Sequence, residues 1–307
     1  MVTTYLPAAL EDEFFSALAR ARFPGIIVPW RSLAPEDRPR VTILVGWHVP
    51  QAVIDALPNL AWIQAAGAGV DWTLDLSWRK TIVLTRMVDV FGPEMAEYAL
   101  AATLAWVKDW PRLWALNQQH RWDPYPVRML ASLTVGILGA GSIGQAVIRL
   151  FHPLVKEVRA MGRRQPRLAG IAGYAASDAA SFYQGLDALI VVVPLTPSTH
   201  HLVGRDAFSR MSHGAYVINL SRGAVVDTSA LVEAVTSGQL SGAFLDVFDV
   251  EPLPEDHRLW SVPGITVSPH MAGMTRGEPL AEQFLANYER FQRHEALAGV
   301  VDRSRGY

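Results

Sequence analysis

The chain has 307 residues, half of them hydrophobic, and its formal net charge at pH 7 is −2. This composition excludes a disordered chain, and the length favours two domains with separate cores. The nearly balanced charge provides no basic face for nucleic acid, so small molecules are the expected partners. The sequence contains no cysteine, which excludes disulfides and thiolate metal sites and fits a cytoplasmic location.

No association with membranes is expected. No apolar stretch reaches the length of a membrane-spanning helix. The N-terminal sequence "MVTTYLPAALEDEFF" lacks the basic start and the apolar run of a signal peptide, and it carries acidic residues at 11–13. These features agree with the cytoplasmic location that the absence of cysteine favours.

The first hundred residues predict one α/β unit. Residues 13–22 ("EFFSALARAR") follow a helical pattern. Short runs rich in β-branched and aromatic residues predict strands at 25–30, 41–47, 61–66 and 81–87.

A long helical pattern follows at residues 92–110 ("GPEMAEYALAATLAWVKDW"). Pro93 lies near its start, where proline is tolerated, and Pro111 lies at its far end. We interpret this segment as the crossover helix between two domains.

Tryptophans recur in this region at every fourth position, as Trp106, Trp110 and Trp114, with Trp122 nearby. One helix would place the first three on a single stripe. Aromatic stripes at helical spacing usually serve packing. We therefore expect a core or subunit interface in preference to a cage around a substrate.

From about residue 132 onward, short strand patterns alternate with helical ones, which is typical of a doubly wound parallel sheet. The predicted strands are residues 133–138, 157–161, 188–193, 215–220, 242–248 and 265–269. A last helical pattern at 278–297 is expected to pack back on the first domain. The predicted division is therefore a discontinuous substrate domain, 1–103 with 276–307, and a dinucleotide-binding domain, 104–275.

The segment "VGILGAGSIGQAVIRL" carries the clearest motif. Gly139, Gly141 and Gly144 have G-x-G-x-x-G spacing directly between a predicted strand and a predicted helix. The first glycine permits a tight turn, the second lets backbone approach a pyrophosphate, and the third allows close packing of helix on strand. The helix N-terminus would then face the phosphates.

Arginines follow the next predicted strand, where many dinucleotide-binding chains carry a carboxylate. Arg163 lies about 20 residues after Gly144. A carboxylate there would bind the ribose 2′-hydroxyl, whereas a guanidinium suits a 2′-phosphate. Arg163 and Arg164 therefore favour NADP(H), with NAD(H) the less favoured alternative. The structural alternative is that one of the two arginines lies in solvent and binds no cofactor.

Three later segments place polar residues after predicted strands, where ligands bind in open α/β sheets. "INLSRGAVVD", "LDVFDVEPLP" and "SPHMAG" supply Arg222, Glu251 and His270. Together with "AAGAGVD", "GILGAGSIG" and "VVVPLTPSTHHLVG", these segments resemble the D-isomer-specific 2-hydroxyacid dehydrogenase family over most of the chain. Within that family, the chain most resembles the short glyoxylate/hydroxypyruvate reductases that use NADPH. It resembles them in length, in the segment "VGWH" and in the basic residues at 163–164.

The resemblance implies two α/β domains, a Rossmann nucleotide domain and a flavodoxin-like substrate domain, with a cleft between them. It implies reduction of a small 2-keto acid to the D-2-hydroxy acid by a homodimer. Arg222 would bind the substrate carboxylate bidentately and polarise the carbonyl. His270 would donate the proton, and Glu251 would stabilise and orient the charged imidazole.

Further contacts are expected from residues within or beside these motifs. Cofactor contacts are expected from Ser142, Ile143, Pro194, Thr196, Leu220, Ser221, Asp246 and Gly273, with Asp246 near the nicotinamide carboxamide. By resemblance, backbone amides at Ala68 and Gly69 would hold the substrate carboxylate, and Trp47 would border the pocket.

Other interpretations remain at this point. The same chemistry could serve a bulkier keto acid such as phenylpyruvate, since tryptophan and methionine are plentiful, or the chain could be a nucleotide-sensing relative without turnover. No metal site is expected at His200 and His201, because adjacent side chains in extended backbone point to opposite faces and no matching ligands accompany them.

Overall fold

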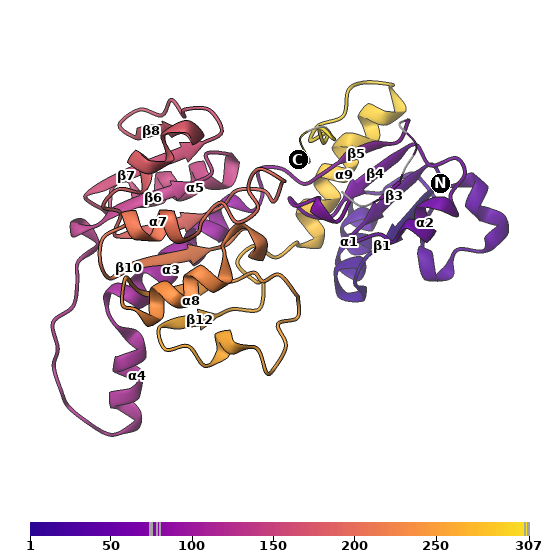
Figure 1. Ribbon diagram of the computed structural model, residues 1–307. Helices are drawn as coiled ribbons and strands as arrows, with labels where there is room; N and C mark the ends of the chain where they lie inside the picture. Colours follow the sequence, from indigo (N-terminus) through magenta and orange to yellow (C-terminus); the bar gives the residue numbers. More distant parts are fainter. Residues whose placement is uncertain (74–75, 78, 80, 304, 306–307) are drawn as a thin grey trace. The chain divides into compact units, whose positions relative to one another are not determined.

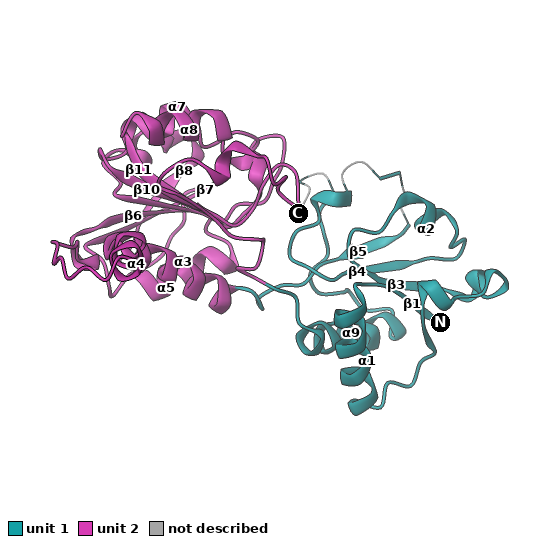
Figure 2. Ribbon diagram, turned by 90° about the horizontal axis from the view of Figure 1, so that it is seen from below, with its two compact units in different colours: residues 1–91, 274–307 teal, residues 92–273 magenta. Residues whose placement is uncertain are grey.

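The computed structural model describes residues 1–73, 76–77, 79, 81–303 and 305. The chain divides into two compact units, unit 1 (Met1–Phe91 with Met274–Tyr307) and unit 2 (Gly92–Gly273), coloured separately in Figure 2. The sequence predicts that the second domain begins at residue 104. The structure begins unit 2 at Gly92 because helix α3 (Gly92–Val107) packs along its length on α5 (Ser142–Phe151).

Unit 1 is built on a parallel sheet with the strand order β2-β1-β3-β4-β5. Its strands are β1 (Val2–Tyr5), β2 (Ile27–Pro29), β3 (Ile43–Gly46), β4 (Trp62–Ala65) and β5 (Val83–Thr85). Its helices are α1 (Ala8–Arg20), α2 (Gln51–Asp55) and α9 (Gly277–Gln292), with 3₁₀ turns at Trp30–Ser32, Pro35–Arg40 and Asp71–Thr73. This strand order is the flavodoxin-like one, so this part of the fold prediction is confirmed.

Strand β1 was not predicted, although two other strands pair with it. Thr3 and Thr4 are buried, so the strand carries no alternation of apolar and polar residues that could reveal it. The hydroxyl of Thr3 donates to Val28 O at 2.8 Å, and the hydroxyl of Thr4 donates to the buried carboxylate of Glu11. Buried polar side chains here find their partners within the unit.

The C-terminal helix α9 packs side by side with α1 (Figure 1). The ring of Phe284 on α9 stacks on Trp62 of β4, with centroids 5.5 Å apart and planes at 11°. It also meets Phe14 of α1 edge to face at 5.6 Å. All three side chains are fully buried, so the end of the chain completes the core of unit 1.

Unit 2 contains a parallel sheet with the order β12-β11-β10-β9-β6-β7-β8, the doubly wound arrangement predicted. The strands are β6 (Thr134–Leu138), β7 (Glu157–Gly162), β8 (Ala172–Ala175), β9 (Ala188–Val191), β10 (Ala215–Asn219), β11 (Leu240–Leu245) and β12 (Ile265–Val267). The remaining helices are α4 (Trp110–Gln118), α6 (Ala179–Tyr183), α7 (Arg205–Arg210) and α8 (Thr228–Thr236). Further 3₁₀ turns lie at Leu130–Ser132, Ala176–Asp178, Gly223–Val225 and Arg258–Trp260.

Helices cover both faces of this sheet, with α3 and α5 on one side and α7 and α8 on the other (Figure 2). The central strand β9 is buried along its whole length, as expected for a strand covered on both faces. The edge strand β8 was not predicted, because "AGYA" is short and contains no apolar run.

The predicted single helix over 92–110 is wrong in its last turn. Asp109 adopts a left-handed conformation, with φ 50° and ψ 52°, and separates α3 from α4. Pro111 does not end the first helix but lies in the first turn of the second. Aspartate tolerates this conformation better than most residues do, and a pattern of apolar spacing contains no sign of it.

The single tryptophan stripe is therefore wrong too. Trp106 on α3 stacks on Tyr216 of β10 at 5.1 Å, and its Nε1 donates to Ser241 Oγ at 2.9 Å. Trp110 and Trp114 lie on α4, where both are exposed. Figure 1 shows α4 and the long loop after it extending away from the sheet of unit 2. In the part of the chain described, no helix is long and apolar enough to cross a bilayer.

The packing of α9 predicts a large stability loss for Phe284→Ala. Removing a fully buried phenylalanine leaves a cavity and should lower the free energy of unfolding by about 3–5 kcal/mol. Urea unfolding followed by tryptophan fluorescence measures this. The exposed neighbour Glu282→Ala on the same helix is the control and should change stability by less than about 0.5 kcal/mol; similar losses for both variants would contradict the packing argument.

Candidate active site

The glycine-rich turn joins β6 to α5. Gly139 has a φ of 113°, and a Cβ there would lie 2.6 Å from Val192 O. A Cβ on Gly144 would collide with the carbonyl oxygen of Gly139. By contrast, a Cβ on Gly141 would meet no heavy atom within 4 Å. Two glycines thus shape the turn, while the third leaves open space in front of the helix.

This open space suits an anionic group. Gly141 is the N-cap of α5. Because glycine has no side chain, no side-chain cap occupies the N–H groups of the first helical turn, which begins with the exposed Ser142. The N–H groups of such a turn and the helix dipole favour negative charge. The residues present therefore fit the diphosphate of a dinucleotide.

Two hydrogen bonds bring the neighbouring loops to this turn. Gly139 N donates to Met161 O at 2.8 Å, which places the loop after β7 beside the glycines. Val192 N donates to Leu138 O at 2.8 Å, which does the same for the loop after β9. Arg163 and Arg164, in the first of these loops, are exposed, and among the described residues neither forms an ion pair. Both guanidinium groups are thus available to an outside anion.

The loop after β9 is organised by hydroxyl groups. Thr196 is buried, and its hydroxyl lies 3.0 Å from those of Ser198 and Thr199. The hydroxyl of Thr199 donates to Pro194 O at 2.7 Å. Thr199 therefore holds the turn that contains Pro194, and Thr196 in turn contacts Thr199.

The turn after β10 is held by Asn219, a residue that the sequence did not single out. Its side chain is fully buried, and Oδ1 accepts from Ser221 N at 3.1 Å and Ser221 Oγ at 2.7 Å. Its Nδ2 donates to Arg222 O at 3.0 Å. Leu220 is buried, and its N donates to Val191 O at 3.1 Å. Asn219 thus fixes the backbone that presents Arg222; its place at the end of a buried strand is the only sequence signal.

Glu251 and His270 lie in direct contact. Oε2 of Glu251 is 2.6 Å from Nδ1 of His270, and Oε1 accepts from Phe248 N at 2.9 Å. Because an ionised carboxylate can only accept, Nδ1 carries the proton, and Nε2 has no hydrogen-bond partner among the described residues. The imidazole therefore presents Nε2 outward from the pair.

The charge of Arg222 acts on this pair. Partial burial raises the pKa of Glu251, but the hydrogen bonds from His270 and Phe248 N and the positive charges of His270 and Arg222 outweigh it. The net result is a pKa below the ordinary value of 4.5. Unit 2 thus brings together the three residues expected to carry the chemistry.

Asp246 follows β11 and is fully buried. Its carboxylate accepts hydrogen bonds from Ser268 Oγ, Met271 N and Ala272 N at 2.7, 3.0 and 2.9 Å. These partners all come from the segment that contains His270. The expected contact with a nicotinamide carboxamide stays a prediction, as does the contact from Gly273, which ends unit 2.

In unit 1, Trp47 and the loop after β4 lie together. Trp47 directly follows β3, and its N donates to Tyr5 O at 2.9 Å. A Cβ on Gly67 would collide with the Trp47 ring, so the ring covers this backbone. Ala68 and Gly69 come next and are partly exposed. Trp47 therefore borders the loop whose amides the sequence predicts to be functional.

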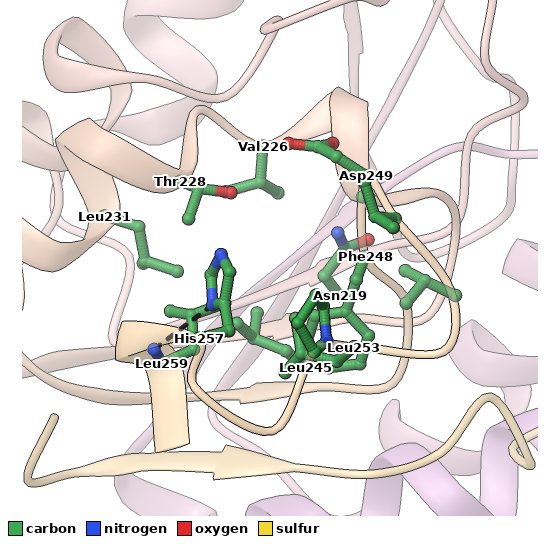
Figure 3. Close-up of a pocket in the computed structure, with 14 residues that line it drawn as sticks. Asn219, Val226, Thr228, Leu231, Leu245, Phe248, Asp249, Leu253, His257 and Leu259 are labelled. Atoms are coloured by element: carbon green, nitrogen blue, oxygen red, sulfur yellow. Dashed lines mark hydrogen bonds between the residues drawn. The ribbon is translucent and has the colours of Figure 1, made fainter. Parts of the chain in front are cut away.

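A cavity of about 90 Å³ lies in unit 2 beside the loop after β11 (Figure 3). Its lining is mainly apolar and includes Val226, Leu231, Leu245, Val247, Leu253 and Leu259. His257 contributes to the lining, and its Nδ1 accepts from Leu259 N at 3.3 Å. None of the three expected catalytic residues lines this cavity, but its lining includes Gly223, which follows Arg222, and Phe248, whose N donates to Glu251.

His200 and His201 differ from the expectation. The backbone is not extended there, since His201 has a φ of 49°, and the two rings stack with centroids 4.1 Å apart. The argument from opposite faces is therefore wrong. The described residues contain no group of three or more histidine, cysteine, aspartate or glutamate side chains arranged to hold a metal ion.

Comparison with known proteins agrees with the motifs. The family model "D-isomer specific 2-hydroxyacid dehydrogenase, NAD binding domain" matches residues 100–272. Glyoxylate/hydroxypyruvate reductase A of Serratia proteamaculans is 32% identical over 311 residues, covering 99% of this chain and 98% of that protein. The protein of that name from Klebsiella pneumoniae subsp. pneumoniae is 33% identical over 308 residues, covering 97% of both chains.

Solved structures give the same result. The D-isomer specific 2-hydroxyacid dehydrogenase from Xanthobacter autotrophicus, in complex with NADPH and MES, is 30% identical with a TM-score of 0.91. The NADPH-dependent glyoxylate/hydroxypyruvate reductase from Sinorhizobium meliloti, in complex with NADP and sulfate, is 29% identical with a TM-score of 0.91. Each alignment covers 100% of this chain and 99% of the other. The family predicted from the sequence is thereby confirmed, and the chain belongs to the D-isomer specific 2-hydroxyacid dehydrogenase family.

Proposed function

We propose that this protein reduces a small 2-keto acid of the glyoxylate or hydroxypyruvate type to the D-2-hydroxy acid with NADPH. The main observation for this proposal is the hydrogen-bonded pair of His270 and Glu251, on which the positive charge of Arg222 acts. The pair lies in the unit that also contains the glycine-rich turn. The names of the Serratia and Klebsiella relatives support the substrate class. The NADPH and NADP complexes of similar structures support the cofactor.

The chemistry divides among the residues described. When bound, the reduced nicotinamide would supply a hydride for the carbonyl carbon next to the substrate carboxylate. Nε2 of His270 would give a proton to the carbonyl oxygen, and Glu251, at Nδ1, would hold the ring and stabilise its positive charge. Arg222 would pair with the substrate carboxylate and polarise the adjacent carbonyl. Hydride and proton together would convert the carbonyl group to an alcohol.

Unit 1 would contribute to substrate binding. We assign the amides of Ala68 and Gly69 to the substrate carboxylate and Trp47 to the border of the pocket. The cover of Gly67 by the Trp47 ring supports this grouping. The predicted cofactor contacts of Pro194, Thr196, Leu220 and Ser221 belong to the same proposal, and the positions of their loops beside the glycine-rich turn support it.

The arginine pair predicts the cofactor preference. We expect the wild type to oxidise NADPH with glyoxylate or hydroxypyruvate in preference to NADH. Arg163→Asp with Arg164→Ser should raise the KM for NADPH roughly tenfold to a hundredfold, because a hydrogen bond to a charged group contributes about 1.5–3 kcal/mol. Steady-state kinetics with both cofactors measures this, with phenylpyruvate as the bulky comparison substrate.

The matched control is Arg167→Ser, an exposed arginine of the same loop. It should leave the preference unchanged. Equal use of NADH by the wild type would refute the role of the arginines, faster turnover of phenylpyruvate would favour the bulkier substrate class, and no turnover would favour a sensing protein.

We also propose a homodimer and, from the absence of cysteine, a cytoplasmic location. Exposed apolar side chains cluster on α4 and the loop after it: Trp110, Leu113, Trp114, Trp122, Val127 and Met129. Trp122 is 98% exposed. Several exposed apolar side chains within one short region are typical of an interaction site, and a second copy of the chain offers the same region through two-fold symmetry.

This surface predicts the oligomeric state. Light scattering during size exclusion should give the wild type twice the mass of one chain, and Trp114→Asp with Trp122→Ser should give the mass of one chain. Trp260→Ser removes a tryptophan that is also exposed but lies elsewhere in unit 2, and it should stay dimeric. A wild type with the mass of one chain would exclude the dimer.

The lowered pKa of Glu251 predicts a pH-dependent contribution to stability. A carboxyl group whose pKa is lower in the folded chain stabilises the fold above the unfolded pKa, and this contribution is lost as pH falls through the folded pKa. Glu251→Gln should therefore reduce the free energy of unfolding near pH 7, and the difference from the wild type should shrink below about pH 4.5. Urea titrations between about pH 3 and about pH 7 measure it, with Glu282→Gln as the exposed control; a difference independent of pH would contradict the argument.

A further inference from the structure

The segment that carries His270 is held in an uncommon conformation. His270 has a φ of 50°, in the left-handed region that residues other than glycine rarely occupy. Such a conformation persists only where surrounding contacts enforce it. His270 N donates to Ser268 O at 3.1 Å, but this local bond does not connect the segment to the rest of the unit.

Asp246 supplies that connection. Its buried carboxylate accepts one hydrogen bond from before His270, from Ser268 Oγ, and two from after it, from Met271 N and Ala272 N. A buried carboxylate is tolerated only when its oxygens are hydrogen-bonded. Both ends of the turn at His270 are therefore attached to one group at the end of β11.

Tyr98 on α3 extends this connection. Its hydroxyl lies 2.8 Å from Ser268 Oγ. Ser268 has a single hydroxyl proton and gives it to Asp246, which can only accept, so Tyr98 must be the donor to Ser268. The Tyr98 ring meets Phe244 of β11 edge to face at 5.6 Å and 67°. The donors in this hydrogen-bond chain are thus fixed: Tyr98 donates to Ser268, and Ser268 donates to Asp246.

We propose that Tyr98 and Ser268 are positioning residues that hold His270 through Asp246. The proposal rests on the proposed function for the role of His270, although neither residue takes part in the chemistry itself. Glu251 orients the imidazole ring, whereas the hydrogen bonds from Tyr98 through Ser268 to Asp246 fix the backbone from which the ring projects. Loss of the Tyr98 hydroxyl frees Ser268 to rotate, which loosens one of the two attachments of the turn.

The first test is Tyr98→Phe, which removes one oxygen and keeps the ring against Phe244. We expect kcat with glyoxylate and NADPH to fall about three- to tenfold, since a small misplacement of a catalytic group is costly. The dissociation constant for NADPH, measured by its fluorescence, and the KM for glyoxylate should change less than about twofold. Ser268→Ala should lower kcat at least as much, and adding Tyr98→Phe to it should cause no further loss.

Tyr216→Phe is the matched control. Tyr216 is a tyrosine of unit 2 that is more deeply buried than the half-buried Tyr98, and the side chain of Thr266 acts on its hydroxyl. It should lower the melting temperature about as much as Tyr98→Phe while leaving kcat unchanged. Equal kcat values for the wild type and Tyr98→Phe, or equal losses in Tyr98→Phe and Tyr216→Phe, would overturn the proposal.

A measurement without turnover separates this proposal from the proposed function. In ¹H–¹⁵N NMR spectra, Tyr98→Phe should shift the backbone amides of Met271 and Ala272 and the imidazole nitrogens of His270, and Tyr216→Phe should not. If the wild type reduces no 2-keto acid, the proposed function fails, while these shifts still test the positioning chain. Unchanged signals in Tyr98→Phe would refute the positioning role of Tyr98, whether or not the protein is active.

Discussion

The parallel pairing of β6 with β7 and β9 is the constraint on which the site in unit 2 depends. Parallel strands end at the same edge of a sheet, and here the ladder continues through Gly139 N to Met161 O and Val192 N to Leu138 O. The glycine-rich turn, the arginine loop and the hydroxyl-rich loop therefore begin side by side. None of these loops needs to be long or rigid by itself, because its starting point is fixed by the sheet.

Buried polar side chains at strand ends then determine how the catalytic loops leave the sheet. Asn219, the last residue of β10, bonds to the backbone that leads to Arg222, and Asp246, directly after β11, bonds to the backbone around His270. Each side chain replaces the hydrogen bonds that the sheet no longer supplies beyond the strand. Because an unsatisfied buried amide or carboxylate is costly, the loops have few alternative conformations.

The motifs could be predicted from sequence because each has a local cause. Gly139 and Gly144 are needed for a positive φ and a close approach, and such needs leave a fixed spacing in the chain. The break at Asp109 could not be predicted, because one left-handed residue interrupts a helix without changing the apolar spacing on either side. Tyr98 could not be found either. Its partner Ser268 is distant in sequence, and a half-buried tyrosine on a helix gives no sign of a hydrogen bond to another element.

The packing of α9 on unit 1 also has a consequence for the order in which the protein folds during synthesis. The ribosome releases the strands of unit 1 first, but the helix that covers Phe14 and Trp62 emerges only after all of unit 2. Unit 2 is continuous and can fold while the chain is still being made. Unit 1 exposes its aromatic face until α9 has been synthesised, so the unit whose strands are made first completes its core only after unit 2 has emerged.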